Sequence, residues 1–428
     1  MDIVRGYKIE FASEVPISDS NRRKVFSKSE APVIQEELKR LLEMGAIQKV
    51  EECVGGYISP IFTSQKKDGS TRMILNLKSF NDSVQYYHFK MDTLEHAIAL
   101  LTPHCWMASI DLRNAYHSIA ICPEHQKFLT FQFEECFYQY KCLPFGLSSA
   151  PRIFTKVLKP VFSTLRGWGH SVLGYIDDTL LVAQEPRECE TGVRDAVELL
   201  ERLGFVVHDV KSVFTPSQSI VFLGFELNSR SMTVTLTPEK KLSLVTKCQG
   251  LKDKKVASIR EVSRVIGSLV AACPGVQYGM IYVKPLEIEK NKALSVSRGN
   301  FEGKMNITKD IITCLEWWIK NVERQVRNID HGTPKIVVHT DASLSGWGAH
   351  REQLEARGGW SSEESSGHIN ELELRAVLFG LKSLCKECSN THIRVTIDNT
   401  TAVICVNKQA GTKSPPCMMW PDRFGNGV

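Results

Sequence analysis

Two adjacent aspartates, Asp177 and Asp178, stand between two short apolar runs, and this arrangement restricts the fold more than any other feature of the chain. The runs at residues 172–176 and 179–182 are short and apolar, which is typical of buried strands. Two polar residues between such runs usually form a hairpin turn, because Asp tolerates tight turns. Adjacent carboxylates also repel each other, and a bound cation would relieve that repulsion. The pattern therefore predicts either an ordinary hairpin or a cation-binding one.

A third aspartate, Asp111, ends another apolar run, which begins at Trp106. Alternate residues of a strand share a face, so Asp111 is expected to point away from the face that carries Ile110. A single Asp in such a place is most often a helix cap or a turn residue. Together with Asp177 and Asp178, however, it supplies three carboxylates from neighbouring strands, which suits a two-metal site for phosphoryl transfer.

The sequence around these aspartates resembles that of reverse transcriptases. Residues 175–178 (Tyr-Ile-Asp-Asp) resemble the family's Tyr-x-Asp-Asp box, and residues 111–116 are similar to its first-aspartate motif. Between them, residues 143–151 (Leu-Pro-Phe-Gly-Leu-Ser-Ser-Ala-Pro) look like the loop and helix start that contact template and nucleotide. The motifs occur in the family's order, and the resemblance extends over residues 35–290. Residues 143–155 are most similar to the LTR/DIRS-type retrotransposons, and specifically to the DIRS type.

This resemblance implies a role for individual residues. Two Mg²⁺ ions, with Mn²⁺ as the other candidate, would be held by Asp111 and Asp177, and Asp178 would complete the metal site by contributing charge nearby. Tyr116 would reject a 2′-hydroxyl, and Lys211 would give a proton to the leaving pyrophosphate. The implied nucleotide-binding residues are Lys66, Lys67, Arg72, Tyr116, Phe145, Gly146 and Lys211, and the implied primer-binding residues are Phe222, Leu223 and Gly224. Asn76 stands where many relatives have Asp, which removes a charge but affects no catalytic assignment.

Each of these residues also has an ordinary structural interpretation. A lysine or arginine in an exposed hairpin is most often a solubilising charge, and an aromatic residue at a strand end usually packs in the core. The assignments therefore depend on the motifs occurring together and in order.

A second ordered set of carboxylates follows a polar break at residues 331–334. Asp341 ends a predicted strand, Glu371 and Glu373 lie on a predicted helix, and Asp398 ends a further strand. Such a set suits two-metal hydrolysis of a phosphodiester and is similar to ribonuclease H. Helical angle leaves the choice between the two glutamates open. Glu373 is preferred because its Glu-Leu-Arg-Ala context fits the Glu-x-x-Ala pattern of that family.

A ribonuclease H normally adds a fourth carboxylate from a later helix. Few residues follow Asp398, and Asp422 stands in a glycine-containing tail without helical periodicity. The expected second site is therefore incomplete, with weak or absent nuclease activity.

Apolar periodicity predicts several elements between the motifs. A helix is expected over residues 33–44 with Gly45 as its cap, with Ile34, Leu38, Leu41 and Leu42 on its apolar side. A hairpin turn is expected at residues 67–70 and a second helix over 188–203. Residues 236–325 are lysine-rich and predicted to be helical.

The resemblance implies an α+β, multidomain fold: a right-hand polymerase (fingers, palm with an antiparallel sheet, thumb) followed by a ribonuclease H-like α/β domain, truncated. The N-terminal lead and fingers would occupy 1–91, the palm 92–235 with an inserted fingers segment at 117–148, the thumb and connection 236–332, and the ribonuclease H-like domain 333–428.

Composition agrees with several folded domains in the 428 residues, of which 43% are hydrophobic and 24% charged. The net charge of +5 does not by itself indicate nucleic-acid binding. Thirteen cysteines without framework spacing indicate reduced thiols. With neither a signal segment nor an apolar run of about 18 residues, the sequence predicts no membrane association and an intracellular protein, cytoplasmic or nuclear.

The leading interpretation is an RNA-directed DNA polymerase that uses an RNA or DNA template with primer and deoxynucleoside triphosphates, with an attached ribonuclease H-like domain for RNA/DNA hybrids. The alternative is a catalytically silent nucleic-acid-binding remnant of a retrotransposon polyprotein. An RNA-synthesising polymerase is disfavoured by Tyr116. Nothing in the sequence indicates an oligomeric state.

Overall fold

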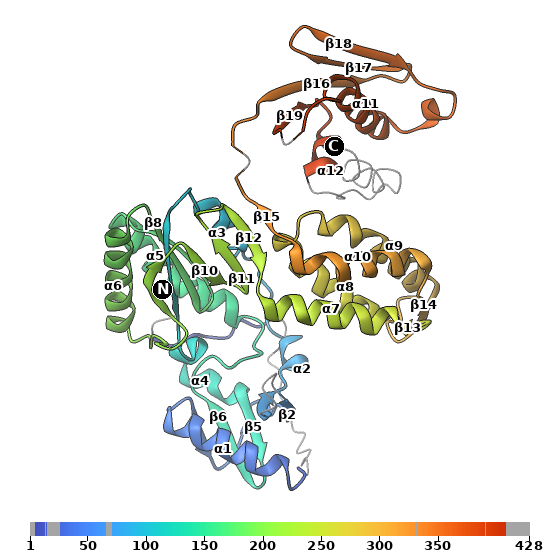
Figure 1. Ribbon diagram of the computed structural model, residues 1–428. Coiled ribbons are helices and arrows are strands. Elements are labelled where there is room, and N and C mark those ends of the chain that lie inside the picture. Colours follow the sequence, from blue (N-terminus) through green and yellow to red (C-terminus); the bar gives the residue numbers. More distant parts are fainter. Residues whose placement is uncertain are drawn as a thin grey trace. The chain divides into compact units, whose positions relative to one another are not determined.

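The computed structural model describes residues 5–12, 14, 26–65, 71–330, 332–389 and 391–407. The chain packs as two compact units, Met1–Phe222 and Leu223–Val428, whose elements are labelled in Figure 1. Within the described ranges, no helix combines the length and the apolar character that crossing a membrane requires.

The centre of the first unit is an antiparallel sheet with strand order β7-β8-β4-β9. Its strands are β4 (Trp106–Asp111), β7 (Ser171–Tyr175), β8 (Asp178–Ala183) and β9 (Val213–Ser217). Helices α5 (Ala150–Gly167) and α6 (Pro186–Arg202) pack against this sheet and against each other. Residues 179–182 of β8 are all buried, as expected of a central strand that is covered on both faces.

A smaller three-stranded sheet of order β1-β6-β5 and the β2-β3 hairpin complete the first unit. They consist of β1 (Ile47–Val50), β2 (Ile61–Gln65), β3 (Thr71–Leu75), β5 (Thr130–Phe133) and β6 (Cys136–Tyr140). The short helices are α2 (Lys78–Asn81), α3 (Leu94–Leu100) and α4 (Pro123–Gln126), and β10 (Ser219–Phe222) ends the unit. The turn expected at residues 67–70 lies outside the described residues, although the strands beside it pair antiparallel.

Helix α1 (Glu30–Glu43) shows how far periodicity predicts an element. Ile34, Leu38 and Leu41 are buried as expected, whereas Leu42 is 41% exposed because the buried stripe is narrower than predicted. Gly45 follows the helix with φ +67°, a left-handed conformation that costs glycine little.

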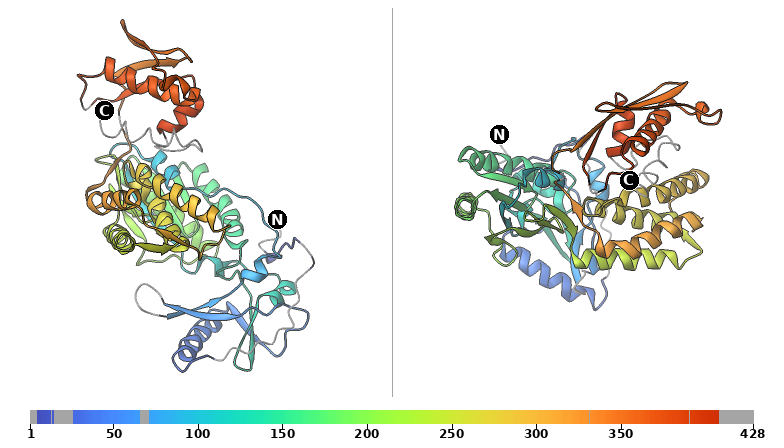
Figure 2. Two further views of the ribbon diagram at one scale, coloured as in Figure 1. Left: turned by 90° about the vertical axis from the view of Figure 1, so that its right-hand side faces the viewer. Right: turned by 45° about the horizontal axis from the view of Figure 1, so that its top comes forward.

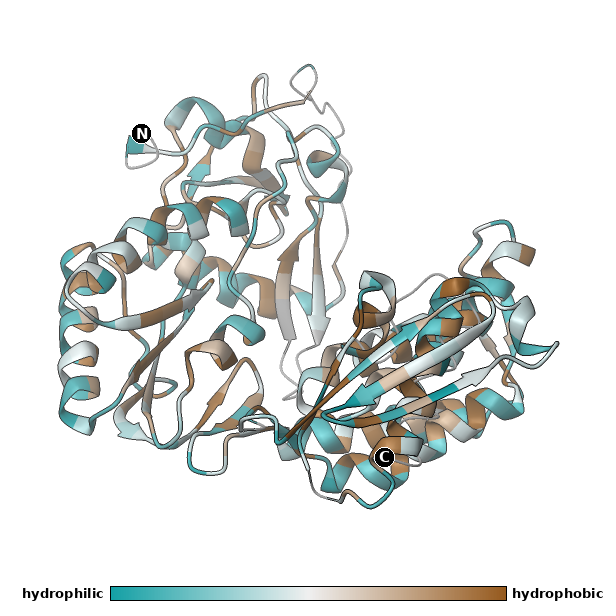
Figure 3. Cartoon of the chain, turned by 90° about the horizontal axis from the view of Figure 1, so that it is seen from above, coloured by the Kyte–Doolittle hydropathy of each residue, from teal (hydrophilic) through white to brown (hydrophobic). Residues whose placement is uncertain are grey.

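The second unit begins with a sheet that includes β11 (Phe225–Asn228), β12 (Thr233–Leu236) and β15 (Arg327–Asn328). The predicted helical region follows as α7 (Pro238–Lys252), α8 (Ile259–Ala272), α9 (Lys284–Val296) and α10 (Lys309–Asn321), which lie side by side in Figures 1 and 2. Within it, β13 (Val256–Ser258) pairs with β14 (Lys304–Asn306), a small sheet that periodicity did not predict. Helices are brown along one side and teal along the other in Figure 3, as amphipathic packing requires.

The last part of the second unit is a four-stranded sheet of order β18-β17-β16-β19. Its strands are β16 (Ile336–Ala342), β17 (Gly346–Arg351), β18 (Leu354–Gly359) and β19 (Ile393–Thr396), of which β16 and β19 pair parallel. Helix α11 (Ile369–Leu384) packs on this sheet, and α12 (Thr400–Asn407) packs on α11. A Cβ at Gly380 would lie 2.8 Å from the Cβ of Ala349, so this close approach of helix and sheet requires glycine.

Candidate active sites

Strand pairing brings Asp111, Asp177 and Asp178 to one end of the central sheet. Asp111 is opposite Asp178 in the register of β4 and β8, and the N–H of Leu112 donates to the carbonyl of Asp177 at 2.9 Å. Ile176 closes the β7-β8 hairpin with φ +54°, a conformation that is unusual for a β-branched residue. The hairpin therefore holds both adjacent aspartates beside Asp111 at some cost in backbone strain.

Asp177 and Asp178 hold a proton more tightly than ordinary aspartates do. Burial, followed by the charges of Asp177 and Asp111, raises the pKa of Asp178 to about 6, and burial with Asp111 also raises the pKa of Asp177. Lys211 opposes both shifts, and its Nζ lies 3.9 Å from Oδ1 of Asp111. The site thus holds more negative charge than the single lysine compensates, which fits a divalent cation.

The segment that carries Lys211 is fixed to the backbone of Asp111. The N–H of His208 donates to the carbonyl of Asp111 at 2.8 Å, and the N–H of Asp111 donates to Oγ of Ser212 at 3.0 Å. The Lys211 side chain itself is 64% exposed, so its amine remains accessible above the carboxylates.

Tyr116 and Phe145 form an aromatic contact next to this centre. Their ring centroids lie 5.2 Å apart, and Tyr116 also meets Phe154 edge to face at 5.6 Å. Burial, with the charges of Asp177 and Tyr175, raises the pKa of Tyr116 to about 12, so its hydroxyl stays neutral at physiological pH. Phe145 is 58% exposed and offers an open ring face to a ligand.

Two residues of this region were not expected from the sequence. His117 meets Phe145 edge to face at 5.3 Å, and its ring nitrogens have no hydrogen-bond partner among the described residues. Burial lowers the pKa of His117 to about 4, so its ring is a neutral packing group. The side chain of Asn81 accepts from the N–H of Ser148 and donates to the carbonyl of Gly146, both at 2.9 Å. These contacts join residues that are far apart in the sequence, so no local sequence pattern predicts them.

The other expected nucleotide and primer residues are placed less fully. Lys66 and Lys67 lie outside the described residues, and Arg72 lies on β3 opposite Ser64. Phe222 ends β10. Leu223 and Gly224 form the turn that follows, with φ of +51° and +74°, and Lys240 donates to the carbonyl of Leu223 at 2.9 Å.

A second centre unites Asp341 at the end of β16, Glu373 on α11 and Asp398 just beyond β19. Among the described residues, these three side chains form a group that could hold a metal ion. One carboxylate oxygen of each lies within 4.8 Å of those of the other two. Glu373 is 3% exposed, and no described donor reaches its Oε2. Burial, then Asp398 and Asp341, raises the pKa of Glu373 to about 7, while a backbone hydrogen bond from Ala342 opposes the shift. A buried carboxylate oxygen needs a partner, and because no donor reaches this one, a bound cation would supply it.

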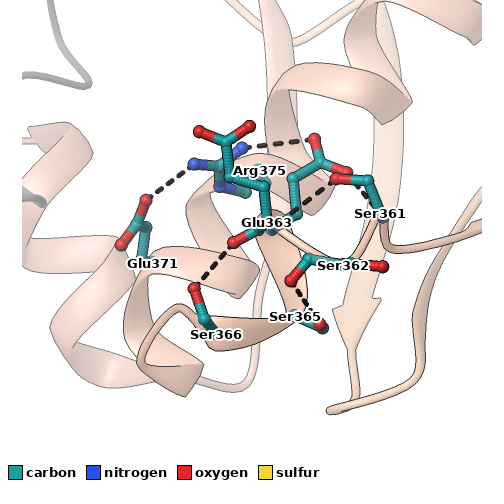
Figure 4. Close-up of polar contacts among 8 residues, drawn as sticks. Ser361, Ser362, Glu363, Ser365, Ser366, Glu371 and Arg375 are labelled. Atoms are coloured by element: carbon teal, nitrogen blue, oxygen red, sulfur yellow. Dashed lines mark hydrogen bonds and ion pairs between the residues drawn. The ribbon is translucent and has the colours of Figure 1, made fainter.

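The two glutamates of α11 have different surroundings. Arg375 donates to Glu371 at 2.8 Å and to Glu364 at 3.2 Å, as Figure 4 shows for the neighbourhood of Arg375. Glu371 is therefore part of an ion-pair network that ties the segment before α11 to the helix, and Glu373 is the one that meets the two aspartates. Asp422 lies outside the described residues.

Residues 64–227 match the family model described as "Reverse transcriptase (RNA-dependent DNA polymerase)". The chain is 22% identical over 411 residues to the "Enzymatic polyprotein" of Figwort mosaic virus (strain DxS), covering 91% of this chain and 57% of the relative. It is 24% identical over 415 residues to that of Carnation etched ring virus, covering 92% and 59%. The chain thus spans less than two thirds of the length of these relatives.

A shorter match joins the chain to a transposon protein. It is 24% identical over 174 residues to the "Transposon Tf2-3 polyprotein" of Schizosaccharomyces pombe, covering 41% of this chain and 13% of the relative.

Solved structures share the fold. The foamy viral protease-reverse transcriptase in complex with dsDNA aligns with a TM-score of 0.63 at 19% identity, covering 98% of this chain and 86% of that chain. The same protein in complex with an RNA/DNA hybrid aligns with a TM-score of 0.59 at 19% identity, covering 99% and 55%.

Proposed function

We propose that this chain is an RNA-directed DNA polymerase that adds deoxynucleotides to a primer 3′ end, because residues 64–227 match the reverse transcriptase family model. The observation that carries the proposal is the meeting of Asp111, Asp177 and Asp178 at one sheet end, with the pKa of Asp178 at about 6. These carboxylates would hold two Mg²⁺ ions, which supply charge neutralisation during phosphoryl transfer. Template, primer and deoxynucleoside triphosphates are the partners that this reaction requires.

The chain's own groups then select and orient the nucleotide. The exposed ring of Phe145 lies against the sugar or base of the nucleotide. Tyr116, which contacts this ring, excludes a 2′-hydroxyl by steric contact. The accessible amine of Lys211 gives a proton to the leaving pyrophosphate. Lys66, Lys67 and Arg72 grip the triphosphate, and residues 222–224 hold the primer end.

Primer extension on an RNA template with Mg²⁺ tests the proposal. Asp177→Asn should lose extension, because one metal-holding carboxylate is gone while the side-chain shape is kept. Glu201→Gln, an exposed carboxylate on α6, is the matched control and should extend normally. Full activity of Asp177→Asn would refute the assignment.

The second centre supports a second activity, ribonuclease H-like cleavage of an RNA/DNA hybrid. It is favoured by the convergence of Asp341, Glu373 and Asp398 and by the donor-less buried oxygen of Glu373. The test is cleavage of labelled RNA in an RNA/DNA hybrid. Cleavage by the wild type that is lost in Asp398→Asn would support this second activity, and equal cleavage by the wild type and Asp398→Asn would refute it.

A silent remnant of an LTR/DIRS-type polyprotein is the alternative. Such a protein would bind primer-template in a filter or fluorescence assay and yet fail to extend it. Extension by the wild type rules this alternative out.

A further inference from the structure

An open hollow of about 450 Å³ lies beside Asp341 on the sheet of β16 to β19. Glycines form much of its lining, namely Gly346, Gly348, Gly358 and Gly359. A Cβ added to Gly348 would meet nothing within 4 Å, so the space above this residue is open. A larger side chain at this position would occupy part of the hollow.

One cross-strand row runs through the hollow. Asp341 on β16 is opposite Gly348 on β17, and Gly348 is opposite Arg357 on β18. Neighbouring strands are about 4.8 Å apart, so the backbones at Asp341 and Arg357 are separated by roughly 10 Å. The missing side chain of Gly348 leaves a gap with the centre's carboxylate on one side and a guanidinium on the other.

Arg357 is available to bind a ligand. It is exposed, and no described residue forms an ion pair or side-chain hydrogen bond with it. Ser343, the hydroxyl-bearing residue of the lining, accepts hydrogen bonds from the N–H groups of Ser345 and Gly346 within its own turn. Arg357 is thus the one cation among the residues that line the hollow.

We propose that Arg357 binds a backbone phosphate of the nucleic-acid strand next to the phosphate that is held at Asp341. The planar guanidinium can donate two parallel hydrogen bonds to phosphate oxygens, and the glycine lining lets a sugar-phosphate backbone approach the sheet. Arg357 would be a positioning residue for the second centre, and the inference rests on the proposed binding of RNA/DNA hybrids there.

A charged edge strand offers the competing explanation. Arginine on an edge strand discourages pairing with other chains, and β18 is an edge strand of this sheet. Arg394 provides the matched control, because it is an exposed arginine on β19, the other edge strand of the sheet. It pairs in register with Val337 and so lies outside the row that contains Asp341. An edge-charge role would make the two arginines equivalent in hybrid binding.

The test measures the affinity of the full chain for an RNA/DNA hybrid at several salt concentrations without divalent cations. Arg357→Ala should weaken binding about fivefold, equivalent to about 1 kcal/mol, and should flatten the log Kd against log salt slope by about 1. Arg357→Lys should keep the slope but lose part of the affinity, because a lysine cannot form the paired contact. Arg394→Ala should match the wild type in both.

The outcomes separate this inference from the proposed function. No hybrid binding by the wild type would overturn both. Normal wild-type binding with an unchanged slope in Arg357→Ala, or an equal loss in Arg394→Ala, would overturn the phosphate contact alone. Far-UV circular dichroism melts of each variant exclude unfolding as the cause, and the Lys variant provides a second reading if the Ala variant fails to fold.

Discussion

The two carboxylate centres of this protein balance their charge in different ways. Asp111, Asp177 and Asp178 lie at one end of an antiparallel sheet and are all half-buried, and Nζ of Lys211 lies 3.9 Å from Oδ1 of Asp111. The second centre joins two exposed aspartates to the buried Glu373, and no described lysine or arginine forms an ion pair with any of the three. Lys211 therefore partly neutralises the first centre, whereas the second centre has no such partner among the described residues. This difference gives each centre its own response to pH, cations and substitution.

The largest expected effect concerns the buried Glu373. Its pKa in the folded protein is about 7, above the usual value of 4.5, so its contribution to stability is full below about pH 4.5 and is lost as pH rises through 7. Without divalent cations, the free energy of unfolding should fall by up to about 3 kcal/mol between pH 4.5 and 8. Denaturant unfolding measures this, and Mg²⁺ or Mn²⁺ should restore the loss.

Glu373→Gln sharpens the same comparison. The neutral amide should remove most of the pH dependence of unfolding and the response to cations. Glu371→Gln is the control on the same helix and should retain both. A wild type whose stability is indifferent to cations at pH 8 would break the proposed contrast between the centres.

Tyr116 tests selectivity at the first centre. Tyr116→Ala should relax discrimination against ribonucleotides by roughly a hundredfold, because the contact that excludes the 2′-hydroxyl is removed. Single-nucleotide incorporation with matched ribo- and deoxynucleotides measures the ratio. Tyr116→Phe should keep it, since the ring remains; unchanged discrimination in the Ala variant would remove the steric role.

Arg375 should matter for stability at about 1–2 kcal/mol. It links Glu364 and Glu371, so Arg375→Met leaves both glutamates without this partner. A double-mutant cycle with Glu371→Gln gives the coupling energy. A coupling of zero would show that the network of Figure 4 does not anchor α11.

Lys211 should have the smallest effect on stability, below about 1 kcal/mol, because its ion pair with Asp111 is long and exposed. Lys211→Met should nevertheless slow nucleotide incorporation more than this stability change explains. If the losses in stability and in incorporation rate are equally small, Lys211 is only a surface charge and has no role in catalysis.

Local sequence patterns predicted the elements that carry both centres. The runs at residues 106–111 and 172–182 form β4, β7 and β8, and the predicted helix that carries Glu371 and Glu373 forms α11. These predictions succeed because an element buried on one face leaves an apolar period in the sequence, and a wholly buried strand leaves a continuous apolar run.

Contacts between distant segments were beyond such patterns. Asn81 binds a loop 65 residues away, and the small sheet of β13 and β14 joins ends of helices across the lysine-rich region. The choice of Glu373 over Glu371 rested on a motif, because helical angle left it open. The burial of Glu373 beside Asp341 and Asp398 is a tertiary property. The hollow at Gly348 depends on the pairing register of three strands, which no single segment encodes.

The most direct test of a polymerase centre at Asp111, Asp177 and Asp178 measures two activities in the wild type and in two variants. Incorporation of a deoxynucleotide on an RNA template and cleavage of an RNA/DNA hybrid are measured with Mg²⁺ for the wild type, Asp177→Asn and Glu373→Gln. Asp177→Asn should abolish incorporation, and Glu373→Gln should leave it at the wild-type rate. Incorporation that survives Asp177→Asn, or that falls equally in both variants, would contradict a polymerase centre at Asp111, Asp177 and Asp178.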